Sequence, residues 1–590
     1  MENILTKLGV NLLENHLAHF GVWAPNAKEV YVMGDFNEWA DEELLMANSG
    51  DGCWELEVKN VAVGQGYKFV IVTHDGHKIY RNDPYARQLT NSIGNSLIPD
   101  LEFDWEEADE FEIEDLNKLI IYELHIGTFN KLEDQEVGDF YSAAEKLPYL
   151  KDLGINLIEV MPASEFPGDY SWGYNPAHPF AIESAYGGPK GFKHFVKKAH
   201  QLGMGVIMDV VYNHFGPTDM DLWQFDGWSE NGLGGIYFYN DWKAKTPWGD
   251  TRPDYGRQEV RQYIFDNAFM WLEEYKCDGL RMDMVPYIRN VFADGSVDNS
   301  IEEGKTLIQW INSEIIAKYP RKFLVAEDLH TLDEITKPTF EGGFGYTSQW
   351  CAAFVHPIRE LLITQEDVHR NLYSAEAAIL KKYNNDVFQR VIYTESHDEV
   401  ANGKARVAEE IAVDDVNNFY SVKRSMLAAT LVMTAPGIPM IFQGQEMLED
   451  GYFDDGDPIE WKLTKKYKGF VQYFKDLISL RSNVAEGTMG LQSQFCETIH
   501  LNNEDKILVF HRFDKKGPQD SVIVIINFSG QSQENYQISL PFEANWELVL
   551  ASDAEVYSPH STPAPVKFSI DDATLTATLA SYSAMIFTCS

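Results

Sequence analysis

The sequence has few cysteines, no long apolar run and little positive charge, and each shortage excludes a class of protein. Its five cysteines are scattered and show no CxxC or Cys/His spacing, which argues against a disulfide framework or a bound metal. No stretch of about 18 apolar residues occurs, so we expect no transmembrane helix. Residues 1–7 lack a basic region followed by an apolar run, which predicts a cytoplasmic protein.

Charge and composition narrow the possible partners. Lys and Arg number 48 against 91 Asp and Glu, a formal net charge of −43, so we expect neither a nucleic-acid nor a membrane partner. A hydrophobic content of 44% is typical of a globular protein, and 590 residues exceed one hydrophobic core. No P-loop, HExxH or GxSxG motif is present, and nothing indicates a cofactor or an oligomeric state.

The pattern of apolar residues divides the chain into three domains and a linker. Residues 1–100 alternate short β-type runs with turn signals, which predicts an N-terminal β-sandwich. Residues 101–116 form an acidic linker that we expect to be solvated, because ten of the sixteen residues 100–115 are Asp or Glu. Residues 117–485 alternate strands with helices, and residues 486–590 return to β runs, which predicts a C-terminal antiparallel β-sandwich.

The central region has the rhythm of a (β/α)₈ TIM barrel, an α/β fold, with a doubly wound open sheet as the alternative. An excursion over residues 215–256 follows the third predicted strand. The predicted strands are Leu119–His125, Ile155–Met161, Val206–Tyr212, Gly279–Met284, Phe323–Glu327, Tyr346–Trp350, Arg390–Thr394 and Met440–Gln443.

Polar side chains gather at the ends of four of these strands, where a barrel places its catalytic residues. A single carboxylate after a strand is more often a helix cap or an ion-pair partner, but several around one barrel mouth predict a catalytic site. These residues are Asp209 and His214, Arg281 and Asp283, Glu327, and His397 and Asp398.

Three of these carboxylates suit glycosidic cleavage with retention, which needs a nucleophilic carboxylate and a second carboxyl group about 5–5.5 Å away. Asp283 and Glu327 follow adjacent strands and can meet that distance. Arg281 shares a strand face with Asp283, so we expect it to hold that carboxylate ionised and oriented. Asp398 is available to bind sugar hydroxyls in the transition state.

The four strand ends that carry these residues resemble the signature regions of family 13 of the glycoside hydrolases, the α-amylase family, in their order, spacing and strand context. The resemblance implies that Asp283 is the nucleophile, Glu327 the general acid/base and Asp398 the transition-state stabiliser. It also implies a set of residues that bind the sugar in the −1 subsite: Tyr174, Asp209, His214, Arg281 and His397.

Residues 19–27 and 32–39 resemble the β-sandwich module of the family 48 carbohydrate-binding type that precedes the barrel in branching and debranching enzymes. The implied partner is an α-1,4-glucan such as glycogen, starch or a maltooligosaccharide. Segments 121–129 and 184–189 look like malto-oligosyltrehalose trehalohydrolases, whereas segments 395–400 and 442–446 look more like glycogen branching enzymes.

Three functions remain open. The first is a branching-type transferase that passes the cleaved chain to a 6-hydroxyl, which we favour because trehalohydrolases tend to show Asn-His-Asp-Gln where this chain has Ser396–Glu399. The second is an α-glucan hydrolase of the α-amylase or trehalohydrolase type. A non-catalytic glucan-binding protein is the third, and the presence of all three carboxylates argues against it.

Two features near the site bear on metals and on substrate. Typical calcium-dependent α-amylases carry a Lys-His pair three and four residues after the nucleophile, where this chain has Pro286 and Tyr287. Asn213 stands where a calcium ligand could be, but the excursion is short, so we expect no obligatory metal.

The excursion is rich in aromatic rings, and we expect Trp242 and Trp248 to stack on a glucan chain, with a packed lid as an equal alternative.

Overall fold

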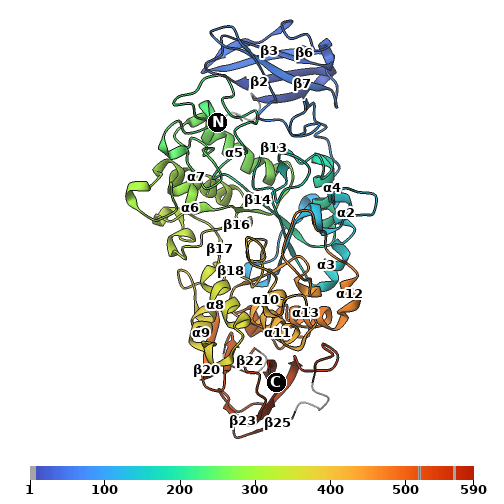
Figure 1. Cartoon of the computed structure of the whole chain (residues 1–590), viewed down its shortest axis with the longest axis vertical. Coiled ribbons are helices and arrows are strands. Elements are labelled where there is room, and N and C mark those ends of the chain that lie inside the picture. Colours follow the sequence, from blue (N-terminus) through green and yellow to red (C-terminus); the bar gives the residue numbers. More distant parts are fainter. Residues whose placement is uncertain (1–7, 516, 518–519, 562–566, 590) are drawn as a thin grey trace.

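The protein is elongated, with a β-sandwich at one end, a barrel in the middle and a second set of β-sheets at the other end (Figure 1). The computed structural model describes residues 8–515, 517, 520–561 and 567–589. The expectation about the start of the chain rests on residues 1–7, which lie outside this described part.

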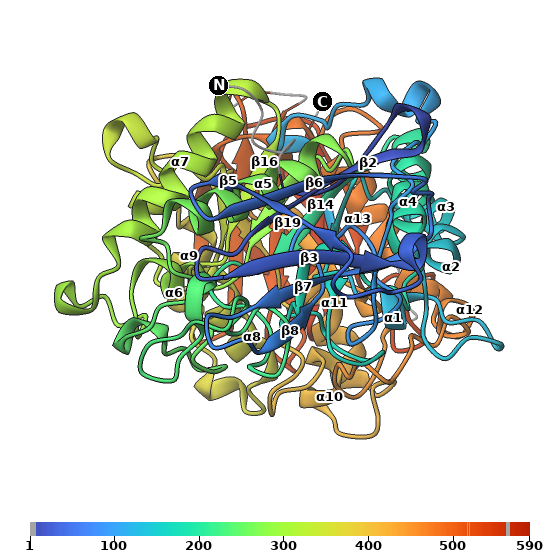
Figure 2. The same ribbon diagram turned by 90° about the horizontal axis from the view of Figure 1, so that it is seen from above.

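Two antiparallel sheets form the N-terminal β-sandwich, as the sequence predicts (Figure 2). Their cores are built from alternate residues of the strands, and Trp23 and Trp54 are buried there, whereas Trp39 is half-buried. One sheet has the order β1 (Gly9–Leu13), β2 (Leu17–Trp23), β6 (Cys53–Lys59) and β5 (Ala47–Gly50). The other has the order β4 (Leu44–Leu45), β3 (Glu29–Gly34), β7 (Gly66–Val72) and β8 (Lys78–Arg81), with β9 (Ser96–Leu97) paired to β7.

The sandwich docks on the excursion that follows the third barrel strand. The guanidinium of Arg81 donates to the carbonyl oxygens of Trp223, Gln224 and Phe225 over 3.0–3.2 Å. Asp226 Oδ2 accepts hydrogen bonds of 2.9 Å from both the backbone and the side-chain amide of Asn26. These contacts fasten the excursion to the sandwich.

The central domain is a closed barrel of parallel strands, which confirms the predicted TIM barrel and excludes the open sheet. All the predicted strands overlap observed ones, and the two sides of the strands are filled with apolar residues because both faces are covered. The barrel strands are β10 (Ile121–Leu124), β11 (Leu157–Val160), β14 (Gly205–Val210), β15 (Gly279–Met282), β16 (Phe323–Ala326), β17 (Ser348–Trp350), β18 (Arg390–Ile392) and β19 (Ile438–Phe442). A small hairpin, β12 (Ser164–Glu165) with β13 (His178–Ile182), lies outside the barrel sheet.

Helices surround this barrel (Figure 1). Among the described residues, no helix is both long and apolar enough to cross a membrane. The helices are α1 (Ile126–Phe129), α2 (Phe140–Ala144), α3 (Leu147–Leu153), α4 (Gly188–Gln201), α5 (Gln258–Glu273), α6 (Val285–Arg289), α7 (Glu302–Lys318), α8 (Ala352–Ile363), α9 (Leu372–Leu380), α10 (Val407–Ile411), α11 (Phe419–Thr434), α12 (Leu463–Lys466) and α13 (Lys468–Arg481).

The acidic segment 101–116 is more ordered than a solvated linker. Its described acidic side chains are exposed, but Ala108 and Ile113 are buried and Phe111 stacks on His200 of α4 with ring centroids 4.4 Å apart. The apolar residues between the acidic ones therefore pack this segment against the outside of the barrel.

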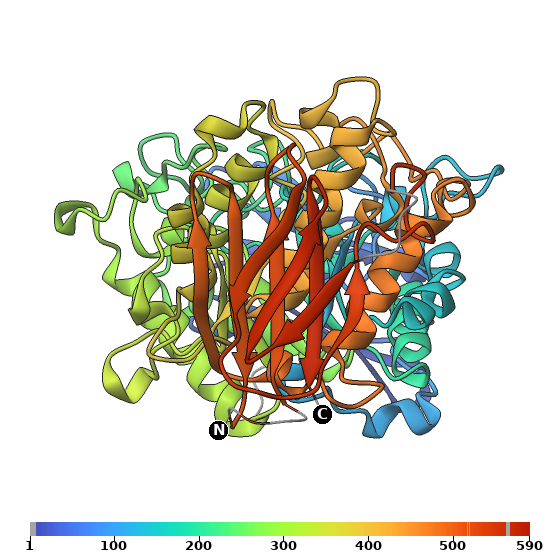
Figure 3. The same cartoon turned by 90° about the horizontal axis from the view of Figure 1, so that it is seen from below.

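The C-terminal region forms two antiparallel sheets, as predicted (Figure 3). Arg512 is fully buried and donates to the carbonyl oxygen of Thr434 at the end of α11, which ties these sheets to the barrel. The strands are β20 (Phe495–Asn502), β21 (Ile507–Phe513), β22 (Val522–Asn527), β27 (Ser583–Cys589) and β24 (Trp546–Ala551) in one sheet, and β23 (Gln533–Ser539), β26 (Thr574–Leu579) and β25 (Phe568–Asp571) in the other.

The first prediction concerns the contact between the sandwich and the excursion. Arg81→Met keeps much of the side-chain volume but removes the donors for three carbonyl groups, so we expect a loss of about 2–3 kcal/mol in the free energy of unfolding. Lys59→Met, at an exposed position of the same sandwich, should change it by less than about 0.5 kcal/mol. Chemical denaturation of both variants measures this, and equal stabilities would show that Arg81 does not hold the interface.

Candidate active site

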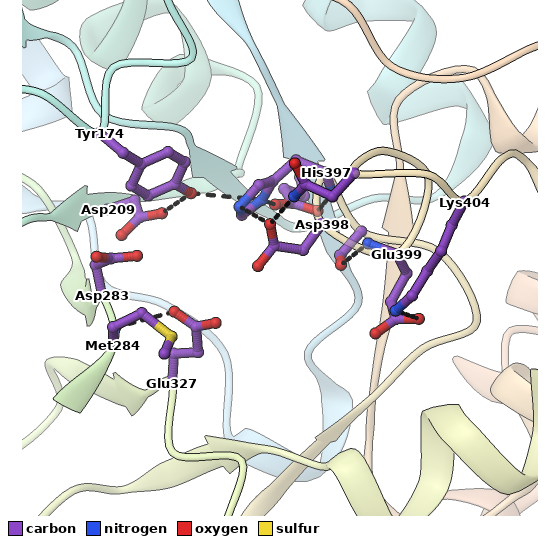
Figure 4. A network of polar contacts seen from close by, with 12 residues as sticks. Tyr174, Asp209, Asp283, Met284, Glu327, His397, Asp398, Glu399 and Lys404 are labelled. Carbon is purple, nitrogen blue, oxygen red and sulfur yellow. Dashed lines mark hydrogen bonds and ion pairs between the residues drawn. The ribbon is translucent and has the colours of Figure 1, made fainter. Parts of the chain in front are cut away.

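Residues from four barrel strands meet at the carboxyl end of the barrel (Figure 4). Asp209 lies near the end of β14 and Arg281 lies in β15, with Asp283 directly after that strand. Glu327 follows β16, and Asp398 lies in the loop after β18. The three carboxylates of Asp283, Glu327 and Asp398 are turned toward one another.

Arg281 is the centre of this group. Its Nη1 atom is 2.7 and 2.8 Å from the two carboxylate oxygens of Asp209 and 3.0 Å from Asp283 Oδ1. Its Nη2 atom is 2.8 Å from Glu327 Oε2. The guanidinium is fully buried and lies 4.3 Å from the centre of the Trp350 ring, so one aromatic wall and three carboxylates fix its position.

The barrel register explains why these residues meet. Asp209 is paired with Arg281 across β14 and β15, so their side chains leave the sheet at the same level. Arg281 and Asp283 are two residues apart and therefore lie on one face of the strand. Glu327 follows the neighbouring strand β16, whose Ala326 is paired with Met282.

The backbone after Asp283 is strained in a way that orients Glu327. Met284 has a φ of 37°, in the left-handed region that a side chain with a Cβ disfavours at a cost of about 1–3 kcal/mol. In this conformation its N–H donates to Glu327 Oε2 over 2.9 Å. Asn213 Nδ2 donates to Asp283 Oδ2 over 2.6 Å, so each of the two carboxyl groups accepts a hydrogen bond that fixes its orientation.

The electrostatics of Asp283 differ from the sequence-based expectation. Burial and the neighbouring Glu327 carboxylate raise the pKa of Asp283 well above its usual range, although Arg281 acts in the opposite direction. Arg281 acts on the pKa of Asp283 in the expected direction, but burial and the neighbouring carboxylates outweigh it, because this one cation is also paired with Asp209 and Glu327. The nearby Glu327 carboxylate therefore makes ionisation of Asp283 less favourable than it would be in water.

Tyr174, Asp209 and His397 form a layer beside this pair. The Tyr174 hydroxyl donates to Asp209 Oδ2 over 2.6 Å, and its ring stacks on the His397 imidazole at 4.9 Å. Burial raises the pKa of Asp209 to about 6, against the effects of Arg281 and Tyr174. The structure thus brings together all three of these residues, as expected for one sugar-binding position.

Two buried glutamates inside the strands are part of the site and are absent from the sequence-based prediction. Glu123 in β10 accepts from the backbone N–H of His397 and lies 2.5 Å from its Nδ1 atom. Burial alone would lower the pKa of His397, but Glu123 and Asp398 raise it to about 9. Glu159, paired with Glu123 across β10 and β11, is fully buried, and burial and the Glu123 charge raise its pKa well above the usual range.

Asp398 is the most accessible of the carboxylates. Its side chain is 42% exposed, and it contacts Asn402 Nδ2 at 3.3 Å and His397 Nε2 at 3.8 Å. It makes none of the ion pairs with Arg281 that hold the other three carboxylates. This freedom suits a group that must take hold of an incoming ligand.

Some aromatic rings of the excursion are packed in the interior, as in a lid, and others are exposed, as a stacking surface would be. Phe225, Tyr237, Phe238 and Tyr239 are buried, whereas Trp242 and Trp248 are about half exposed. Trp248 stacks face to face on His214, with centroids 4.6 Å apart.

His214 itself is neutral at ordinary pH, because burial lowers its pKa to about 4. Its Nδ1 atom is 2.6 Å from Asn213 Oδ1, so both ends of the Asn213 amide are engaged by the protein. Within the part of the chain that is described, no three Asp, Glu, His or Cys side chains are grouped to hold a metal ion.

Comparison with known proteins agrees with this geometry. The family description "Alpha amylase, catalytic domain" matches residues 124–250 and 228–483, "Carbohydrate-binding module 48" matches residues 7–86, and "Alpha amylase, C-terminal all-beta domain" matches residues 498–590. The fold and site define a glycoside-active barrel enzyme. The chain belongs to the α-amylase family, glycoside hydrolase family 13.

Relatives with curated names cover nearly the whole chain. It is 30% identical to a 1,4-α-glucan branching enzyme of Corynebacterium efficiens over 92% of this chain and 76% of that protein. It is also 30% identical to a branching enzyme of Fusobacterium nucleatum over 91% of this chain and 88% of that protein.

Solved structures show the same fold at lower identity. A pullulanase from Anoxybacillus sp. LM18-11, complexed with maltotetraose, matches with a TM-score of 0.77 and 18% identity over 99% of this chain and 87% of that one. A pullulanase from Bacillus acidopullulyticus matches with a TM-score of 0.77 and 19% identity over 99% and 75% of the two chains.

The second prediction tests the role of Asp283. Asp283→Asn should lower turnover of amylose by a factor on the order of 10⁴ or more, because an amide cannot act as the nucleophile. The unfolding temperature should stay at or above the wild-type value, because the amide replaces a buried carboxyl group whose ionised form is disfavoured at that position. Activity assays and circular dichroism measure the two effects, and near wild-type turnover would refute the role.

The third prediction concerns Glu123. In the folded protein the pKa of His397 is about 9, above its ordinary 6.5, so the Glu123–His397 attraction stabilises the fold fully below pH 6.5 and is lost as the pH rises through 9. In Glu123→Gln burial lowers that pKa, so the alkaline limb of kcat/KM should move to lower pH. The stability difference from wild type should be largest near about pH 6 and shrink toward about pH 10.

Glu123→Asp, which keeps the negative charge, is the matched control and should retain more of the alkaline limb. An alkaline limb that is identical in Glu123→Gln and wild type would show that the charge on His397 has no part in turnover.

Proposed function

We propose that the protein is a retaining 1,4-α-glucan branching enzyme, which cuts an α-1,4 bond and passes the cleaved chain to a 6-hydroxyl. The observation that carries the proposal is the pair Asp283 and Glu327 held by one guanidinium, because a retaining two-step displacement requires two neighbouring carboxyl groups. The branching-enzyme names of the relatives, at 30% identity over most of the chain, support the choice of acceptor.

In the first step the Glu327 carboxylic acid protonates the glycosidic oxygen of the scissile bond while the Asp283 carboxylate attacks C1 of the same sugar. The C1–O bond breaks, a covalent bond from C1 to Asp283 forms, and the shortened chain leaves with the proton. In this step Glu327 carries the proton and Asp283 is ionised, as the roles of acid and nucleophile require.

In the second step the ionised Glu327 takes the proton from a 6-hydroxyl of another chain, and that oxygen attacks C1. The bond to Asp283 breaks and the carboxylate is restored. In this proposal Asp398 and the His397 imidazolium bind the sugar hydroxyls as positive charge develops at C1, and Tyr174 stacks beneath the ring.

The choice of a sugar acceptor over water rests on the excursion. Trp248 is fixed on His214, next to the Asn213 that binds Asp283, and it presents an exposed ring beside the reacting groups. A ring face holds an acceptor sugar at high local concentration and gives nothing to a water molecule.

The proposed substrate is an α-1,4-glucan such as glycogen, starch or a maltooligosaccharide. The match of residues 7–86 to a carbohydrate-binding module supports a glucan ligand. We also propose a cytoplasmic location, because the five cysteines are scattered along the sequence without the spacing of a disulfide framework.

The fourth prediction separates transfer from hydrolysis. On amylose the iodine colour should fall while reducing ends rise little, with new α-1,6 signals in the proton spectrum. Trp248→Ala should raise the ratio of hydrolysis to transfer several-fold, because the acceptor loses its stacking partner. If reducing ends rise in step with the loss of colour and no α-1,6 linkages form, the protein is an amylase-type hydrolase and the proposal is wrong. If the protein releases trehalose from a trehalose-ended maltooligosaccharide, it is a trehalohydrolase.

A further inference from the structure

Two aromatic pairs bridge the same two segments of the chain outside the catalytic residues. One ring of each pair comes from the excursion, and the other comes from the stretch that follows Asp283 and contains α6. The inner pair is Trp248 with Tyr287, at a centroid distance of 5.3 Å. The outer pair is Trp242 with Phe292, at 6.5 Å and with 36° between the ring planes.

The outer pair is open to solvent. Trp242 is 52% exposed and Phe292 is 48% exposed, although Phe292 directly follows the buried Val291. Asp241 and Lys245 are exposed on the same short segment as Trp242 and provide polar groups next to its ring. An exposed pair of rings with polar groups at its edge is the arrangement that recognises a sugar, with its apolar face and its hydroxyl rim.

A buried arginine holds the two rings together. Arg252 is fully buried, and its Nε atom donates to the carbonyl oxygen of Lys243, next to Trp242. Its Nη2 atom donates to the carbonyl of Val291, next to Phe292, over 2.8 Å. Burying a guanidinium is costly, so a clamp between these two backbones marks a geometry that the fold maintains.

The loop that carries Phe292 is also fixed from within. The buried Asn290 accepts from the backbone N–H of Phe292 at 3.0 Å and donates to the carbonyl of Ser296 at 2.9 Å. The Phe292 ring is thus presented by an ordered turn, which lowers the entropy lost when a ligand stacks on it.

We propose that Trp242 and Phe292 form a second glucan-binding platform, which holds a linear α-1,4-glucan segment beyond the sugar at Asp283. The inference rests on the proposed function for the identity of the ligand. The glucose units of an α-1,4 chain turn relative to one another, and a bent platform of two tilted rings follows that turn better than a flat one. The inner pair connects this platform to the catalytic residues, because Trp248 lies on His214 and Tyr287 lies four residues after Asp283.

The test measures binding without turnover, in the full-length Asp283→Asn protein. Isothermal calorimetry with maltoheptaose and with soluble amylose gives the dissociation constants. Trp242→Ala and Phe292→Ala should each weaken amylose binding about three- to tenfold, and the double variant should be less than multiplicative because the two rings form one platform. Phe292→Tyr, which keeps the ring, should retain the affinity.

Two further variants separate the platform from general effects. Phe340→Ala removes an exposed ring elsewhere on the surface, 87% exposed, and should leave the affinity unchanged. Arg252→Met should weaken amylose binding as the ring variants do, because it releases the clamp. If that variant fails to fold, the ring variants alone decide.

Unchanged affinity in both alanine variants, or an equal loss in Phe340→Ala, would overturn the platform. A change in sedimentation coefficient with unchanged affinity would also overturn it and show that the rings join two copies of the chain. These outcomes are independent of the proposed function, because a wild-type protein that binds amylose through these rings but forms no α-1,6 linkage would refute branching and leave the platform in place.

Discussion

The carboxyl end of the barrel depends on one buried guanidinium that pairs with three carboxylates. Asp209, Asp283 and Glu327 converge on Arg281 inside the protein, where an unpaired charge is strongly unfavourable. One cation cannot fully compensate three anions, and this imbalance together with burial raises the pKa of Asp283. Acid-assisted attack by a carboxylate needs such a site, with a proton available on one group and negative charge on its neighbour.

The second constraint is mechanical and concerns the excursion after β14. At one end it is fastened to the N-terminal sandwich by Arg81, and at the other Arg252 clamps it to the segment that follows Asp283. Its inner rings are buried in this contact, whereas Trp242 and Trp248 are left on the outside. The sandwich therefore has a structural part in holding the excursion that carries the exposed rings.

Much of the fold and of the candidate site could be predicted from the sequence, because the barrel repeats a simple pattern of apolar strands that end in polar residues. The positions of Asp283 and Glu327 follow from that pattern. The sharing of Arg281 among three carboxylates does not follow from the pattern, because it depends on which side chains meet across neighbouring strands. Trp350, which also contacts Arg281, comes from a strand far along the chain. Glu123 lies within an apolar strand. The only sign of its role in the sequence is that a carboxylate in such a strand needs a buried partner, which the structure shows to be His397.

The covalent intermediate on Asp283 is the central claim, and trapping it is the most direct test. Glu327→Gln incubated with α-maltosyl fluoride should form the intermediate, because fluoride leaves without an acid, and should break it down slowly, because the acceptor then lacks its base. Mass spectrometry of the digested protein should find a maltosyl group on the peptide that contains Asp283. A maltosyl group on another residue, or turnover to a β-anomeric product with no adduct, would contradict the account.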